Sequence, residues 1–129
     1  MLSVRNLDLY YGDAQALDRV SLEVPQGAIV AIVGANGAGK SSLIRTIAGI
    51  EVARAGAITF KGAPIAGLES HRICNLGIGQ VAEGRQVFPS LSVLDNLEVG
   101  GLLPRARSQA KRTLDDVFTM FPRLGERRD

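Results

Sequence analysis

The chain has 129 residues, about the length of one ordinary domain, and its 46% hydrophobic and 22% charged residues exclude a disordered protein. Its 15 glycines have no three-residue period, which excludes collagen, and its longest purely apolar run, residues 28–33, is too short for a membrane-spanning helix of ~20 residues. The net charge of +2 is too small to indicate nucleic-acid binding, and the excess of basic residues in 104–129 is more typical of a solvated helical face.

The first predicted elements are two β-strands joined by a short loop. Apolar and polar residues alternate along residues 2–10, with an irregularity near Asn6, and they alternate strictly along residues 20–24. Residues 11–14 form the predicted loop, and Pro25 and Gly27 are typical of the turn that ends the second strand. We expect the two strands to pair antiparallel.

A different kind of strand is predicted next. Residues 28–33 are continuously apolar, which is typical of a strand buried on both faces. A glycine-rich stretch, residues 34–40, separates this strand from residues 41–48, whose apolar residues have helical spacing. Gly49 stands at the usual position after the end of a helix.

The rest of the chain alternates short strands and helices. We predict strands over residues 57–60 and 78–81, a helix over residues 69–76 that Gly77 stops, and a loop over residues 82–91. Ser92 is predicted to cap a helix that runs toward Gly100, because Asp95 completes a capping box. A further helix is predicted from near Ser108 to Pro122. Its apolar face consists of Ala110, Leu114, Val117, Phe118 and Phe121.

The glycine-rich stretch carries a chemical motif. It matches the pattern G-x-x-x-x-G-K-[ST] over the sequence Gly34-Ala35-Asn36-Gly37-Ala38-Gly39-Lys40-Ser41. The glycines let backbone N–H groups converge on a phosphate, and the following helix directs its positive end to the same place. Lys40 can reach the β- and γ-phosphates, and the Ser41 hydroxyl can bind Mg²⁺. A chain of this length matches the pattern by chance roughly once in 250.

Two other interpretations of these glycines are weaker. A strand–helix turn that binds nothing would not explain the lysine at the start of the helix. A dinucleotide-binding fingerprint would need a glycine at Asn36. Residues 77–82 do fit that fingerprint, but no helix is predicted directly after them.

With these motifs the chain resembles the ATP-binding subunits of ABC transporters over essentially its whole length. The matching stretches are Tyr11-Gly12, residues 16–24 with Gly27, residues 34–43, Ala48-Gly49 and residues 55–58. The resemblance implies an α/β fold: the P-loop NTPase core of an ABC ATPase, with an N-terminal antiparallel β subdomain and the start of the helical subdomain. It places the nucleotide-binding core in residues 1–91 and the beginning of the helical subdomain in residues 92–129. Residues 77–79 and 83–93 look like the second ATPase subunit of the branched-chain amino acid importers.

The resemblance also implies roles for individual residues. The whole of Gly34 to Ser42 would contact ATP, with Ser42 touching the α-phosphate. Tyr11 matches the aromatic residue that stacks on adenine. The weaker alternative is that Tyr11 is a core residue at a strand end, a role for which Tyr10 is the stronger candidate. Glu83 stands where most of the family has a glutamine that senses Mg²⁺ and couples to the membrane subunits; the alternative is an ordinary solvated loop residue.

Other parts typical of the family do not occur in this sequence. It has no Leu-Ser-Gly-Gly signature, no strand ending in a magnesium-binding Asp and a catalytic Glu, and no switch histidine, since His71 precedes Glu83. We therefore expect an N-terminal fragment of a longer subunit, with no catalytic residue of its own. The alternatives are a non-catalytic nucleotide-binding remnant, a subunit of a urea-type importer, or a non-transport ABC ATPase that acts on nucleic acid.

The resemblance implies the cofactors and partners as well. The cofactors are ATP and Mg²⁺. The partners are membrane-spanning permease subunits and a second ATPase subunit that pairs head to tail, with no nucleic acid. The subunit would be peripheral on the cytoplasmic face of the cell membrane. The single cysteine, Cys74, and the lack of a secretory signal in the sequence also favour the reducing cytoplasm.

Overall fold

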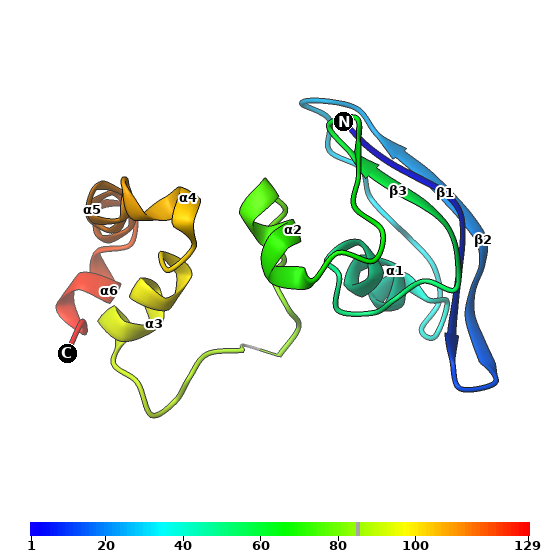
Figure 1. Ribbon diagram of the computed structural model, residues 1–129. Coiled ribbons are helices and arrows are strands. Elements are labelled where there is room, and N and C mark those ends of the chain that lie inside the picture. The colour runs from blue at the N-terminus through cyan, green and yellow to red at the C-terminus, as the bar shows by residue number, and fades with distance from the viewer. Residues whose placement is uncertain (85) are drawn as a thin grey trace. The chain divides into compact units, whose positions relative to one another are not determined.

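The computed structural model describes residues 1–84 and 86–129, which form two compact units, residues 1–80 and 81–129 (Figure 1). The first unit contains β1 (Leu2–Tyr11), β2 (Ala14–Val24), α1 (Lys40–Ile47), β3 (Ala55–Phe60), β4 (Ala63–Pro64) and α2 (Ser70–Leu76). The second unit contains α3 (Val93–Gly100), α4 (Pro104–Arg107), α5 (Ala110–Met120) and α6 (Pro122–Glu126).

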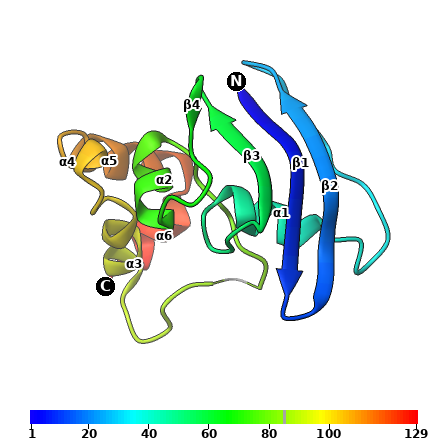
Figure 2. The same cartoon turned by 45° about the vertical axis from the view of Figure 1, so that its right-hand side comes forward.

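The first unit is built on an antiparallel sheet with the strand order β2-β1-β3-β4 (Figure 2). The predicted hairpin of β1 and β2 is confirmed: its register pairs Leu2 with Val24 and Tyr11 with Ala14. The irregularity near Asn6 is confirmed too, because the register shifts between Val4 and Leu7. The extra residue is tolerated because the Asn6 N–H donates to the Ser21 hydroxyl at 2.9 Å.

One apolar core holds the sheet and the two helices of the first unit together. Alternate residues of the strands point to the same face, and the apolar stripe of α1 packs against them. The buried members are Val4, Leu7, Leu9, Leu17, Leu43, Ile47, Ile58, Phe60, Ile65 and Ile73. The core therefore fixes α1 against the β1–β2 hairpin.

Two predicted strands are wrong. Residues 28–33 form no strand, and Ile29 and Val33 are 100% and 92% exposed. Residues 78–81 form no strand either, and Val81 is 99% exposed. A strand buried on both faces needs hydrogen-bonding neighbours in its own sheet. The four strands in the described part of the chain pair only with one another.

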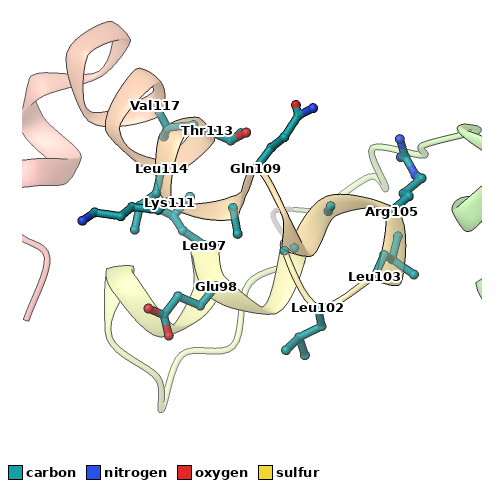
Figure 3. A pocket seen from close by; sticks show the side chains of 14 residues that line it. Leu97, Glu98, Leu102, Leu103, Arg105, Gln109, Lys111, Thr113, Leu114 and Val117 are labelled. Carbon is teal, nitrogen blue, oxygen red and sulfur yellow. The ribbon is translucent and has the colours of Figure 1, made fainter.

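The helices of the second unit agree with the sequence in part. The predicted helix after Ser92 and its capping box are confirmed in α3, and Pro122 ends α5 as expected. The short helices α4 and α6 were not predicted. Each begins with a proline, which fits the first helical turn because no N–H is needed there. A groove of about 710 Å³ lies among α3, α4 and α5, with Leu97, Leu114 and Val117 among its lining residues (Figure 3).

The capping box should carry much of the local stability of α3. The Ser92 hydroxyl accepts from the Asp95 N–H at 3.1 Å, and the Asp95 carboxylate accepts from the Ser92 N–H at 3.3 Å. We expect Ser92→Ala to destabilise α3 by about 1 kcal/mol, because a helix-end N–H loses its partner. Hydrogen exchange of the α3 amides measures this loss. Ser108→Ala at the end of α4 is the matched control, and equal exchange in both variants would contradict the prediction.

Candidate functional site

The glycine-rich loop and the first turn of α1 form one continuous structure. Gly37 and Gly39 both have φ of +83°, a conformation that favours glycine. The Ala38 N–H donates to the Ala35 carbonyl at 3.2 Å inside the loop, and the Leu43 N–H donates to the Gly39 carbonyl at 2.9 Å to start the helix. The N-cap residue Gly39 has no side chain that could cap this end of α1, and the first N–H groups of a helix have no acceptor within the helix itself.

Lys40 folds back over the loop that precedes it. Its ammonium group donates to the Gly34 carbonyl at 2.8 Å and to the Ala35 carbonyl at 2.7 Å. An ammonium group has three N–H donors, so one is left for a ligand while two brace the loop. The geometry thus concentrates a positive charge, a free donor and a helix N-terminus in one place, which suits a phosphate group.

Close contact with β2 fixes the loop in position. A Cβ atom at Gly39 would lie 2.6 Å from the Ala16 carbonyl oxygen and 2.9 Å from the Leu17 side chain. Only glycine allows so close an approach between the start of α1 and the hairpin. The β1–β2 hairpin therefore packs directly against the glycine-rich loop at Gly39.

Tyr11 is the last residue of β1, and its side chain contacts α1. The residue is 46% exposed, which contradicts the core alternative, and its hydroxyl donates to the Ser42 hydroxyl at 3.3 Å. Tyr10 is half-buried, and the Arg54 guanidinium lies 4.9 Å from its ring centroid. The structure thus brings Tyr11, Lys40, Ser42 and the glycine-rich loop together within the first unit. Ser41 is exposed at the second position of α1.

Glu83 belongs to the second unit, whereas Tyr11 and residues 34–42 belong to the first. It is exposed, and its backbone carbonyl accepts from the Gln86 side chain at 3.3 Å. Arg85, which belongs to the family-like segment 83–93, lies outside the described residues. In the part of the chain that the structure describes, no group of three or more His, Cys, Asp or Glu side chains could hold a metal ion.

Asn96 organises the loop after Glu83, a role that sequence reasoning missed. Its side-chain oxygen accepts from the Phe88 N–H at 2.9 Å, and its amide donates to the carbonyls of Phe88, Leu91 and Ser92 at 3.0, 3.2 and 2.8 Å. The available signal was an amide side chain in the first turn of a helix that follows a long loop, where such groups often satisfy backbone partners.

Mg²⁺ and a nucleoside phosphate fit the residues of the first unit. The loop supplies backbone N–H groups and a lysine donor for phosphate, and Ser41 supplies one hydroxyl oxygen. Mg²⁺ commonly binds through one or two protein oxygens together with phosphates and water, so the lack of an acidic cluster among the described residues does not oppose it. No helix in the described residues is long and apolar enough to cross a membrane.

Comparison with known proteins identifies the family. The sequence pattern of the family described as "ABC transporter" matches residues 17–127. The chain is 44% identical over 127 residues to the high-affinity branched-chain amino acid transport ATP-binding protein BraG of Pseudomonas aeruginosa, covering 98% of this chain and 54% of BraG. It is 31% identical over 124 residues to the spermidine/putrescine import ATP-binding protein PotA of Mesomycoplasma hyopneumoniae, covering 96% of this chain and 27% of PotA.

A solved structure agrees with the sequence comparison. The ADP conformation of an ATP-binding cassette of an ABC transporter superposes with a TM-score of 0.71 at 35% identity, covering 81% of this chain and 41% of that one. This likeness confirms the predicted fold class, the N-terminal region of an ABC ATPase. The chain spans about half the length of BraG. The chain therefore belongs to the ABC transporter family.

Proposed function

We propose that this chain is the nucleotide-binding part of an ATP-binding subunit of an ABC importer, and that it binds ATP with Mg²⁺ at residues 34–42 and Tyr11. The observation that carries the proposal is the arrangement of Lys40, whose ammonium group braces the glycine-rich loop and keeps one donor for phosphate. We assign residues 1–91 to the nucleotide-binding core and residues 92–129 to the beginning of the helical subdomain.

Each residue of the proposed site has a physical role. The loop N–H groups and the N-terminus of α1 bind the phosphates, with Lys40 at the β- and γ-phosphates and Ser42 at the α-phosphate. The Tyr11 ring stacks on adenine, where stacking contributes about 1–3 kcal/mol. Ser41 binds Mg²⁺, which neutralises phosphate charge when bound. We assign no catalytic residue to this chain.

We propose branched-chain amino acids as the transported solutes of the whole protein. The identity to BraG is 44%, against 31% to PotA, whose name specifies spermidine and putrescine. The segment 83–93 supports the same subfamily by its resemblance to the branched-chain importers. The proposed partners of the whole protein are membrane-spanning permease subunits and a second ATPase subunit, on the cytoplasmic face of the membrane.

Nucleotide titration of the 129-residue chain tests the binding site. We expect ATP and ADP to bind and AMP to bind markedly more weakly, because the loop and Lys40 meet the β-phosphate. Calorimetry or a fluorescent ATP analogue measures the three affinities. No binding, or equal affinities for ATP and AMP, would overturn the proposed site.

Transport by the whole protein tests the solute. With its permease subunits in sealed vesicles, the whole protein should drive ATP-dependent uptake of leucine, isoleucine and valine, with spermidine as the comparison solute. Uptake of spermidine without uptake of the branched-chain amino acids would overturn the proposed solute and leave the nucleotide site unaffected.

Glu83 is proposed to sense Mg²⁺, which gives a prediction of its own. A carboxylate near the phosphates repels metal-free ATP, whereas it can approach a bound cation, and a neutral amide lacks that repulsion. We therefore expect Glu83→Gln to raise the affinity for metal-free ATP more than the affinity for ATP with Mg²⁺. Both affinities are measured by titration of the whole protein. Equal shifts of both, or no shift, would show that Glu83 is an ordinary loop residue.

A further inference from the structure

Tyr11 and Ser42 contact each other through the parts of their side chains that base stacking does not use. Stacking on adenine needs only the ring of Tyr11, so it gives the phenol hydroxyl no role. In the structure this hydroxyl donates to the Ser42 hydroxyl oxygen at 3.3 Å. The two residues are 31 positions apart in sequence, at the end of β1 and in the first turn of α1, so the contact joins two separate elements.

The direction of this hydrogen bond matters for phosphate binding. A serine hydroxyl can accept a bond and still donate its own proton. Because Tyr11 is the donor, the Ser42 oxygen is occupied as an acceptor, and the proton of Ser42 remains available for a ligand oxygen. A hydroxyl that accepts one hydrogen bond also becomes a stronger donor of the next, because the two bonds polarise each other.

The surroundings keep the pair in place without a ligand. Gly39 lets the Ala16 carbonyl approach the start of α1 closely, which fixes the hairpin relative to the helix. The Thr46 hydroxyl donates to the Ser42 carbonyl at 2.8 Å, one turn along α1, and Ser42 is half-buried. Tyr11 therefore already contacts Ser42 without a nucleotide, and this contact restricts the rotamer of Ser42.

We propose that Tyr11 is a positioning residue for Ser42: its hydroxyl orients the Ser42 hydroxyl so that Ser42 donates to an oxygen of the nucleotide's phosphate chain. This inference rests on the proposed function, and it adds to Tyr11 a role that its ring alone cannot perform. The base end and the phosphate end of the site are then linked by one chain of two hydrogen bonds, from phenol to serine and from serine to phosphate.

A double-mutant cycle on the 129-residue chain tests the inference, with ATP affinity as the measured quantity. Tyr11→Phe keeps the ring and removes the hydroxyl, so we expect affinity to fall about two- to tenfold, the range for one neutral hydrogen bond. In a Ser42→Ala background, the same Tyr11→Phe change should have no further effect. In a Ser42→Thr background, which keeps a hydroxyl, Tyr11→Phe should again lower the affinity.

The controls separate this inference from the proposed function. Tyr10→Phe removes a neighbouring phenol hydroxyl outside the site and should leave ATP affinity unchanged, and circular dichroism checks that every variant folds. Additive effects of Tyr11→Phe and Ser42→Ala, or an unchanged affinity in Tyr11→Phe, would overturn the positioning role while ATP binding by the unaltered chain stands. Failure of the unaltered chain to bind ATP would instead overturn the proposed function, and this inference with it.

Discussion

Lys40→Ala is expected to weaken ATP binding about 10- to 150-fold, which corresponds to the ~1.5–3 kcal/mol of a charge-assisted hydrogen bond. The substitution removes the positive charge at the N-terminus of α1, where we propose that phosphate binds. It also removes the two bonds to the Gly34 and Ala35 carbonyls that brace the empty loop. Both losses lower the affinity, because the phosphates lose a donor and the loop becomes less ordered before binding. Calorimetric titration with ATP measures the change.

Lys111→Ala is the matched control for charge. Lys111 is an exposed lysine of α5 in the second unit, and its replacement changes the net charge by the same amount. We expect it to leave the ATP affinity within about twofold, since an exposed charge outside the site is screened by salt. Equal losses in the two variants would show that overall charge, and not the placement of Lys40, determines binding.

The second large effect is expected for stability. Gly39→Ala should lower the free energy of unfolding of the first unit by about 2–5 kcal/mol. Part of this is the cost of a non-glycine residue at positive φ, ~1–2 kcal/mol. The rest arises because the new Cβ would lie 2.6 Å from the Ala16 carbonyl oxygen, so α1 and β2 have to move apart, which costs about 1–3 kcal/mol by the measure of overpacked cores.

Gly37→Ala separates the two causes. Gly37 has the same φ of +83°, but a Cβ there meets no other atom within 4 Å. We therefore expect Gly37→Ala to show only the conformational cost, ~1–2 kcal/mol. Both tyrosines belong to β1 and the chain has no tryptophan, so tyrosine fluorescence during urea unfolding reports on the first unit. Equal destabilisation in the two variants would mean that the contact between α1 and β2 contributes nothing.

Local signals predicted several elements correctly. The β1–β2 hairpin follows from alternation and turn residues, and α3 follows from the capping box of Ser92 and Asp95. The start of α1 follows from the phosphate-binding motif itself. In each case the deciding interactions join residues close together in the sequence or pair strands through one short turn. Such interactions can be inferred without knowing the rest of the fold.

Long-range partners decided the rest. An apolar run such as residues 28–33 has the composition of a central strand, but its strand conformation depends on neighbours that composition does not specify, and the described residues provide none. The order β2-β1-β3-β4 likewise joins β1 to a strand that follows it by more than 40 residues, and no local pattern determines that pairing.

The sequence by itself determined the chemistry of the candidate site, because the residues that we propose to bind phosphate, Gly34 to Ser42, are contiguous and their spacing is the motif. Only the tertiary structure decided that Tyr11 reaches Ser42, that Lys40 braces its own loop, and that Gly39 is held against β2. The physical reason is that these contacts depend on side-chain direction and on the packing of α1 against the hairpin. The packing of α1 against the hairpin is set by the whole core of the first unit, and not by any segment alone.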